Sequence, residues 1–290
     1  MSGTRTAGFT IGFRRGWSDW QKDLGAVLEW AKANGMGALD LGRDGDTLAS
    51  AVVDAGLRVG SVDLAEWQGM ISADKGKRAE AVAKNADYIK ACARIGPMNH
   101  FLAMLPEKPE LPRSDNFGFM VESFSALAPT LEACGARIVV EGWPGPGALC
   151  CTPEGFRNFF AECPSRSMGV NYDPSHLIRM GIDPLRFLRE FIDRVGHVHG
   201  KDTELSPERL YELGHEQPPT FAKSFGFGGN HWRYAIPGHG VMNWGEAFRL
   251  LAEHGYKGCV CIELEDQDFN GSEATEKLGL QLGARYLEGC

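Results

Sequence analysis

Residues of the types that bind metal ions lie at the ends of four successive β-rich runs in this sequence. They are Glu141 in RIVVE, Asp173 in VNYD, His199 in HVHGKD and Glu263 in VCIELED. Taken singly, each has an ordinary explanation, since an Asp before proline often caps a helix and a Glu after a strand is often a solvated charge. Carboxylates and an imidazole that converge on one place suit a divalent cation such as Mn²⁺, Mg²⁺, Co²⁺ or Zn²⁺. The set of four therefore predicts a metal site.

The elements that must position these residues alternate along the chain. Eight β-rich runs, each followed by a helical segment, lie at 9–13, 38–42, 58–64, 100–105, 137–141, 168–173, 196–202 and 258–265. Such alternation indicates parallel strands joined by helical crossovers, and both an open doubly wound sheet and a closed barrel fit it. Eight units in 290 residues match the barrel. No glycine-rich phosphate loop follows the early strands, which disfavours a nucleotide-binding sheet. We predict an α/β fold, a (β/α)8 TIM barrel forming a single domain over residues 1–290.

In such a barrel the active site forms at the carboxyl ends of the strands. The four predicted ligands would then meet at one mouth. His197 and His199 alternate along the same run, so one of them could be a buried histidine of the barrel interior. His199 is the predicted ligand because it lies nearer the carboxyl end of its strand.

One long segment departs from the regular alternation. Residues 203–242 are rich in glycine, proline and aromatic side chains, as in PPTFAKSFGFGGNHWRYAIPGHG. Long irregular segments in compact domains are usually functional or disordered, and the many aromatic residues argue against disorder. We expect this segment to form a loop at the mouth of the barrel, where it would act as a lid.

Composition excludes several other classes of protein. The formal net charge of −8 argues against general affinity for nucleic acid or an anionic membrane. No run reaches the roughly 20 apolar residues of a membrane span, and the start MSGTRTAGFT lacks a signal peptide's apolar core. The eight cysteines include no CxxC pair, which indicates buried reduced thiols. We expect a cytoplasmic protein without a nucleic-acid or membrane partner.

Several segments together carry a family resemblance. They are VVEGWPGPG, NYDPSHLIRMGIDP, HVHGKDTE, WRYAIPGHGVMNW and GCVCIELED. As an ordered set they resemble the xylose isomerase-like TIM barrels, and within these the sugar phosphate isomerase/epimerase group with its tagatose and psicose 3-epimerases and inosose dehydratases. The resemblance covers roughly residues 8–285 and is strongest between Glu141 and Asp266.

The resemblance implies roles for particular residues. Glu141 and Glu263 would bind the metal and also move protons, while Asp173 and His199 would complete the coordination. His176, three residues after Asp173, matches a histidine that contacts the sugar.

The resemblance also shows a departure from one subgroup. Ketose epimerases usually carry an arginine six residues after the metal histidine, where this chain has Leu205. The HVHGKDTE form resembles less characterised members of the family, in which Lys201 would be a substrate or outer contact.

The chemistry that the resemblance implies is metal-assisted proton abstraction next to a carbonyl. Glu141 or Glu263 would remove a proton from a sugar or cyclitol to give a cis-enediolate, and the metal would stabilise the charge on oxygen. Reprotonation gives an epimer or an aldose–ketose isomer, and loss of a β-hydroxyl gives a dehydratase or lyase. An isomerase or epimerase of carbohydrate metabolism, with Mn²⁺ as the leading metal, is the first expectation and a dehydratase or lyase the second.

Further substrate contacts and an assembly are also expected. Trp67 and Trp143 follow predicted strands and could stack on a sugar face, although an aromatic residue at a barrel rim is as often simple packing. Arg233 lies in the expected lid. Asp202 is expected to orient a neighbour, and a homodimer or homotetramer is expected from the family.

Two alternatives belong to other classes of function. Related barrels cut DNA with a three-zinc cluster, which needs further histidines. SVDLAEW supplies none, His100 begins its run rather than ending it, and GGNHW replaces an Asp-x-His motif. The acidic net charge also disfavours DNA repair. The second alternative is an accessory subunit that has no catalysis of its own.

Overall fold

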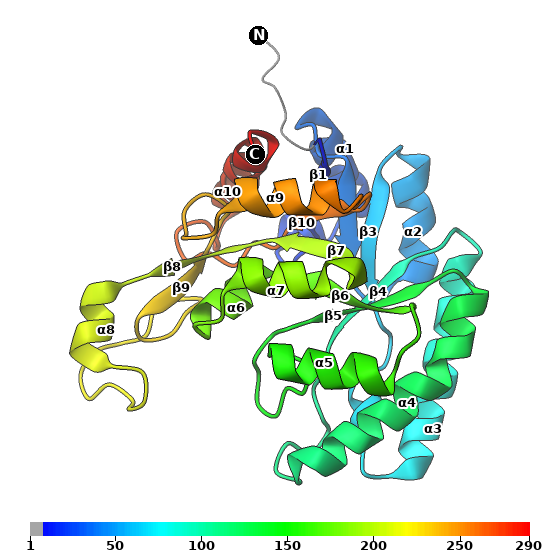
Figure 1. Cartoon of the computed structure of the whole chain (residues 1–290). Coiled ribbons are helices and arrows are strands. Elements are labelled where there is room, and N and C mark those ends of the chain that lie inside the picture. Colours follow the sequence, from blue (N-terminus) through cyan, green and yellow to red (C-terminus); the bar gives the residue numbers. More distant parts are fainter. Residues whose placement is uncertain (1–7) are drawn as a thin grey trace. The chain divides into compact units, whose positions relative to one another are not determined.

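The structure, a computed structural model, describes residues 8–290. Its main sheet is a closed barrel of eight strands in the order β1-β10-β7-β6-β5-β4-β3-β2, drawn in Figure 1. The strands are β1 (Thr10–Arg14), β2 (Ala38–Leu41), β3 (Arg58–Asp63), β4 (Asn99–Ala103), β5 (Arg137–Glu141), β6 (Met168–Tyr172), β7 (Val195–Gly200) and β10 (Cys259–Ile262). The predicted (β/α)8 barrel is confirmed.

Helices follow the strands along the chain. They are α1 (Leu24–Ala33), α2 (Gly45–Asp54), α3 (Lys75–Ala93), α4 (Arg113–Ala133), α5 (Pro153–Glu162), α6 (Pro174–Arg179), α7 (Pro184–Phe191), α9 (Trp244–Glu253) and α10 (Glu273–Glu288). Several begin at side-chain caps that the sequence supplies. Thr152 caps α5 just ahead of Pro153, and Ser272 caps α10. A terminal residue that accepts a backbone N–H in this way fixes where a helix starts.

Contacts divide the chain into two compact units. The first holds residues 8–38, 173–190 and 199–290, and the second holds residues 39–172 and 191–198. In the first unit β1 pairs in parallel with β10, and Ile11 lies opposite Val260. In the second unit β4, β5 and β6 pair in parallel, and Glu141 of β5 lies opposite Asn171 of β6.

The long segment expected to be an irregular loop contains regular structure. β8 (Asp202–Leu205) and β9 (Trp232–Ala235) form an antiparallel two-stranded ribbon, and α8 (Pro207–Leu213) follows β8. Figure 1 shows the ribbon with α8 beyond its end. The expectation of an irregular loop was therefore wrong for the parts that form β8, α8 and β9, where TELSPERLYEL carries strand and helix signals, while residues 214–231 belong to no helix or strand. The lid role of this segment stays a prediction.

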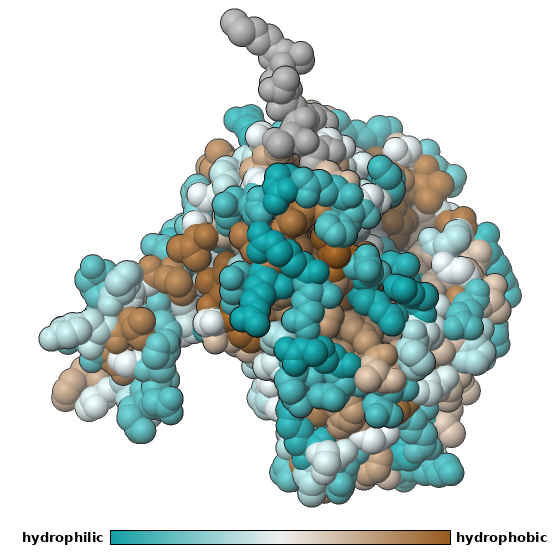
Figure 2. Space-filling view, viewed as in Figure 1, coloured by the Kyte–Doolittle hydropathy of each residue, from teal (hydrophilic) through white to brown (hydrophobic). Residues whose placement is uncertain are grey.

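The segment beyond the ribbon exposes large apolar side chains. Tyr211 is 89% exposed and Phe221 96% exposed. In Figure 2 the surface over α8 mixes brown apolar residues with teal polar ones. Residues 206–231, called the tip below, therefore have little buried core of their own and are connected to the rest of the chain through the ribbon.

Two composition-based expectations can be compared with the structure. All eight cysteines lie among the described residues as free cysteines, and six of them are buried, in line with the expected burial. That the thiols are reduced stays a prediction. Among the described residues, no helix is both long enough and apolar enough to cross a membrane. The start of the chain used in the signal-peptide argument falls mostly on residues 1–7, which lie outside the described residues.

A buried histidine in the second unit affects stability rather than chemistry. His100 in β4 is fully buried, its ring packs edge-on against Tyr88 at 5.7 Å, and within the described residues neither ring nitrogen has a hydrogen-bond partner. Burial disfavours the charged imidazole and lowers the pKa of His100 from 6.5 to about 4. The folded protein therefore keeps this ring neutral where the unfolded chain protonates it.

This difference predicts a pH dependence of stability. As the pH falls from 6.5 to 4, the unfolded chain gains a proton at His100 that the folded protein does not, so the free energy of unfolding decreases, by up to about 3 kcal/mol from this group. The contribution is fully present above pH 6.5. Urea unfolding of wild type and His100→Leu across this range should show a shallower acid loss in the variant. Parallel pH profiles for the two proteins would contradict the assignment.

Candidate active site

Charged side chains in the first unit meet just beyond the ends of three strand segments. Asp173 follows β6, His199 and Lys201 lie at the end of β7, and Glu263 follows β10. Because the strands are parallel, their carboxyl ends lie on one side of the sheet. Asp173, His199 and Glu263 therefore lie close together, as expected for residues at the carboxyl ends of barrel strands.

Asp173 is fixed by its own helix. Its Oδ1 accepts hydrogen bonds from the Ser175 backbone N–H at 2.9 Å and the Ser175 hydroxyl at 2.6 Å, so Asp173 caps α6. Its Oδ2 accepts no hydrogen bond within the described residues but lies 3.2 Å from Lys201 Nζ, 3.4 Å from His176 Nε2 and 4.0 Å from His199 Nδ1. One oxygen thus orients the carboxylate, and the other faces the charged cluster.

Glu263 lies among three cationic or basic groups. It forms ion pairs with Lys201 and with Arg14, whose Nε lies 3.3 Å away, and His199 Nδ1 lies 3.6 Å from its Oε2. Burial alone would raise the pKa of Glu263, but the positive charge of Lys201, with His199 and Arg14, outweighs burial and holds that pKa well below its ordinary value. Glu263 is therefore a carboxylate.

Lys201 is almost fully buried, with only 1% of its side chain exposed. Its Nζ contacts Asp173 and Glu263 and lies 2.9 Å from Glu265 Oε2. It also lies 4.6 Å from the centre of the Tyr234 ring. A buried ammonium is tolerated only with such compensation. Lys201 thus lies next to the predicted metal ligands. The sequence analysis predicted it as a contact of the substrate or of the residues that hold the metal.

His176 and Tyr234 form a protonatable pair beside the cluster. His176 Nδ1 lies 2.7 Å from the Tyr234 hydroxyl, and His176 Nε2 lies 3.5 Å from Lys201 Nζ. Burial raises the pKa of Tyr234, so its phenol stays protonated and can donate to the imidazole. The structure therefore brings His176, predicted as a sugar contact, to the cluster itself.

The donor set is suitable for a divalent cation. Asp173, His176 and Glu263 can each offer one ligand atom, with these atoms within 4.8 Å of one another. His199 also faces both carboxylates. Oxygen and imidazole donors at this spacing suit hard and borderline divalent ions. His176 is thus as well placed as a donor as the predicted ligand His199.

The second unit holds the remaining predicted ligand. Glu141 is the last residue of β5, is 5% exposed, and accepts a hydrogen bond from Asn171 Nδ2 at 3.0 Å. In the same unit His197 Nε2 lies 2.8 Å from Asp40 Oδ2, and both side chains are fully buried. His197 is thus a buried histidine with a carboxylate partner, as one of the two strand histidines was expected to be.

The weaker substrate candidates have structural partners. Trp67 packs edge-on against Phe101 at 5.8 Å, with the Arg43 guanidinium 5.5 Å from its ring. Trp143 lies in the loop after β5 and is half-buried. Arg233 in β9 forms ion pairs with three carboxylates, on Glu204, Asp266 and Asp268. Packing and ribbon structure account for the contacts of Trp67 and Arg233.

Sequence reasoning missed three residues of the cluster. Arg14 is the last residue of β1. A search for polar residues at strand ends, which was applied to the later strands, would therefore have found it. Glu265 could have been found because it lies two residues after Glu263. Tyr234 had no signal, since its place depends on the pairing of β8 with β9.

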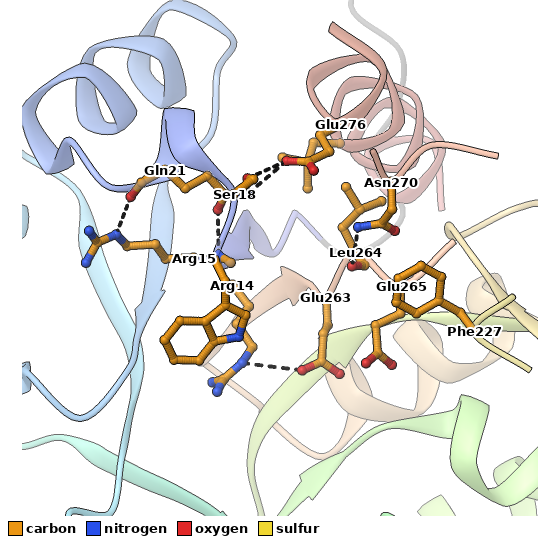
Figure 3. A pocket seen from close by; sticks show the side chains of 13 residues that line it. Arg14, Arg15, Ser18, Gln21, Phe227, Glu263, Leu264, Glu265, Asn270 and Glu276 are labelled. Carbon is orange, nitrogen blue, oxygen red and sulfur yellow. Dashed lines mark hydrogen bonds and ion pairs between the residues drawn. The ribbon is translucent and has the colours of Figure 1, made fainter. Parts of the chain in front are cut away.

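A pocket opens beside Glu263 in the first unit. It has a volume of about 260 Å³, and Glu263 and Glu265 line one part of it. Arg14 and Arg15 from the end of β1 and the residue after it line another part, as Figure 3 shows. The charged cluster thus adjoins a space that can hold a small molecule.

Asp202, the neighbour of Lys201, holds the end of the long segment in place, at residues 238–242. Its buried carboxylate accepts backbone hydrogen bonds from Thr203 at 2.8 Å, Met242 at 3.0 Å and Gly238 at 3.3 Å. Burial raises its pKa against the lowering effect of these N–H groups. A Cβ at Gly240 would lie 2.1 Å from the Asp202 carboxylate, which explains a glycine there. Asp202 therefore positions the chain next to Lys201, as expected.

The comparisons with known proteins agree with this architecture. A sequence model of the xylose isomerase-like TIM barrel family matches residues 15–289. An inosose dehydratase of Clostridium tetani is 32% identical over 94 residues, which make up 32% of this chain and 29% of that protein. The chain spans half or less of the length of the curated relatives it matches.

Solved structures with the same fold cover nearly the whole chain. A D-psicose 3-epimerase crystallised in the presence of D-fructose has a TM-score of 0.71 at 14% identity, over 97% of this chain and 100% of that one. An IolI protein with a bound zinc atom has a TM-score of 0.63 at 15% identity, over 96% and 95% of the two chains. At these identities the likeness shows the fold alone.

The Asp202 anchor leads to a stability prediction. Asp202→Ala leaves three backbone N–H groups, two of them in buried hydrogen bonds, without their acceptor, so we expect the free energy of unfolding to fall by roughly 2–4 kcal/mol. Asp202→Asn keeps one acceptor oxygen and should lose less. Urea unfolding of the three proteins measures this order. Equal stability of wild type and Asp202→Ala would contradict it.

Proposed function

This chain belongs to the xylose isomerase-like TIM barrel family, and we propose that it is a divalent-metal-dependent isomerase or epimerase of a sugar or cyclitol. The observation that carries the proposal is the meeting of Asp173, His199 and Glu263 at the ends of parallel strands. One oxygen of Asp173 is held by Ser175 while the other faces the cluster. A carboxylate oriented in this way is a preorganised ligand.

The proposed ligand set is Glu141, Asp173, His199 and Glu263. Chain topology supports Glu141, because its register partner Asn171 lies two residues before Asp173 along the chain. The hydrogen bond from Asn171 orients the Glu141 carboxylate. His176 is an alternative nitrogen ligand, since its Nε2 already faces Asp173. Mn²⁺ is the leading candidate metal, with Mg²⁺, Co²⁺ and Zn²⁺ as alternatives.

The metal would supply Lewis-acid stabilisation of negative charge on the substrate's carbonyl oxygen. The protein's own residues would move the proton. Glu263 is ionised, as a group must be that accepts the proton from the carbon next to the carbonyl. Glu141 would return a proton to the opposite face to give an epimer, or the two glutamates would exchange these roles. Return of the proton to the neighbouring carbon gives the aldose–ketose isomer.

Substrate contacts would come from groups around the cluster. Lys201 and His176 offer donors to hydroxyl oxygens of the substrate, and the Lys201 ammonium can stabilise a developing oxyanion. Trp67, Trp143 and Arg233 remain predicted contacts of lower rank, since Trp67 and Arg233 already have structural partners. A homodimer or homotetramer is the assembly that we propose.

A dehydratase or lyase is the second candidate, favoured by a specific arrangement. His176, Tyr234 and Lys201 form a row of protonatable groups next to the carboxylates. Such groups can protonate a leaving hydroxyl after the first proton has been removed. The identity with an inosose dehydratase over 94 residues supports the same reading. Products that have lost one water would favour this candidate over isomerisation.

The proposal predicts a metal content and an exchange reaction. We expect about one divalent ion per chain, together with exchange of solvent deuterium into a keto-sugar or an inosose from a panel of such compounds. Glu263→Gln should lower metal affinity by at least about tenfold and the exchange rate by roughly 10²–10⁴-fold. Elemental analysis, calorimetric metal titration and NMR measure these effects. Glu208→Gln in α8 is a matched control that should behave as wild type.

Other outcomes would decide between the classes of function. A protein without tightly bound metal, and without exchange when Mn²⁺, Mg²⁺ or Co²⁺ is added, would overturn the proposed chemistry. The accessory-subunit interpretation would then lead. Full metal binding by Glu263→Gln would instead show that the ligands have been misassigned.

A further inference from the structure

The pocket beside Glu263 extends the site beyond the groups that do the chemistry. Glu263 and Glu265 belong both to the charged cluster and to the pocket lining. The rest of the lining comes from Arg14 at the end of β1 and the segment up to Gln21, from residues between 264 and 280, and from Phe227 in the β8–β9 connection. A molecule bound at Glu263 can therefore project into this space.

The pocket combines apolar surface with hydrogen-bonding groups, as carbohydrate-binding sites do. Apolar surface comes from Trp17, Phe227, Leu264 and Leu280, while Gln21 and other polar residues supply hydrogen-bonding groups. Trp17 is 86% exposed, so its ring is available to a ligand. Sugar rings present apolar C–H faces and hydroxyl-bearing edges, and proteins bind such molecules with aromatic faces and oriented polar groups.

The polar part of the lining is preorganised. Glu276 is only 6% exposed, and it accepts hydrogen bonds from the Ser18 hydroxyl at 2.6 Å and the Trp20 indole N–H at 2.7 Å. The bond from Ser18 is drawn in Figure 3. Gln21 donates to the same carboxylate at 3.3 Å. The segment after β1 is thus tied to α10, and its side chains keep their orientation when a ligand enters.

Phe227 adopts a backbone conformation that an aromatic residue rarely takes. Its φ is +50°, and among the described residues it is the one non-glycine with a positive φ. Strain of this kind persists where surrounding structure enforces it, and it is common at ligand sites. Here the Tyr234 N–H donates to the Phe227 carbonyl at 2.9 Å, and the Gly226 N–H donates to Gln267 Oε1 at 2.9 Å. The turn therefore holds a phenyl ring at the pocket where glycine would fit without strain.

The charges of the lining favour a neutral ligand over a phosphate. Three carboxylates line the pocket, on Glu263, Glu265 and Glu276, against two guanidinium groups. Arg14 is paired with Glu263, and Arg15 donates to the backbone carbonyls of Gln21 at 2.7 Å and Lys22 at 2.8 Å. Lys201 pairs with Glu263 and Glu265. Arg14, Arg15 and Lys201 thus already have carboxylate or carbonyl partners, and an anionic group would gain little from them.

We infer that this pocket binds a second, non-reacting sugar ring, so that the substrate is a disaccharide or another glycoside rather than a free monosaccharide or cyclitol. The inference rests on the proposed function, since it places the reacting ring at the Glu263 cluster. Phe227 and Trp17 provide the stacking surfaces for the second ring, and the segment after β1 provides its hydrogen bonds. Phe227 is thereby a specificity-determining residue.

A binding experiment tests this without requiring turnover. Calorimetry and saturation-transfer NMR would compare maltose, cellobiose, sucrose and trehalose with methyl α- and β-glucoside and with glucose 6-phosphate. We expect at least one disaccharide to bind about tenfold more tightly than either methyl glucoside, and glucose 6-phosphate to gain nothing from its phosphate. Phe227→Gly and Trp17→Ala should remove this preference.

The variants separate binding from folding. Glycine suits the positive φ at position 227, so Phe227→Gly should keep or raise the Tm while losing the disaccharide preference. Phe221→Gly is the matched control, because Phe221 lies in the same connection, is 96% exposed and does not line the pocket. It should bind disaccharides as wild type does.

The possible results distinguish the two proposals. Disaccharides that bind no better than methyl glucosides, or an unchanged preference in Phe227→Gly, would overturn the second-ring subsite. Deuterium exchange into monosaccharides in that case would leave the proposed function standing. A disaccharide preference without deuterium exchange into any keto-sugar or inosose, or into the reducing disaccharides maltose and cellobiose, would instead support the subsite and count against the proposed chemistry.

Discussion

The candidate site depends on the compensation of one buried ammonium. Lys201 has 1% of its side chain exposed and contacts the carboxylates of Asp173, Glu263 and Glu265. Removal of a lysine from water is costly unless opposite charges surround it, and removal of a carboxylate is costly for the same reason. The buried groups Lys201 and Asp173 therefore depend on each other, and the partly exposed Glu263 and Glu265 add to the compensation of the ammonium. The interaction joins residues that follow β6 and β10 to the end of β7, and it concentrates negative charge at the place where proton transfer is proposed.

The same cluster shows how local and long-range constraints can act on one residue. Asp173 accepts the Ser175 N–H as the cap of α6 and also faces Lys201 with its other oxygen. The proline after Asp173 fixes the first residue of that helix, so the orientation of the carboxylate is determined within three residues. Lys201 is likewise followed by Asp202, which the backbone of residues 238–242 holds in place. Local structure thus prepares the groups, and the barrel strands bring them together.

The sequence predicted the parts of the fold that depend on regular alternation. β5 has the bounds expected from RIVVE, and the remaining barrel strands differ from the expected runs by a few residues at their ends. Asp173, His199 and Glu263 could be predicted because each follows or ends a strand. The ribbon could not, since β8 and β9 are separated by 26 residues without a tight-turn signal. Tyr234 and Phe227 were missed for this reason, because their places depend on that pairing.

The ribbon also separates the exposed tip of the long segment from the charged cluster near the base of the ribbon, so that the two can vary independently. Its base is secured at Asp202 and Asp266, whose carboxylates accept the backbone N–H groups of Met242 and Ile236. Beyond that base, residues 206–231 form a tip with largely exposed side chains and little shared core. Insertions, deletions or exchanges in the tip would leave Lys201 and its carboxylates where they are. A lineage could therefore alter which molecules are admitted by remodelling the tip, while the machinery below it stays the same.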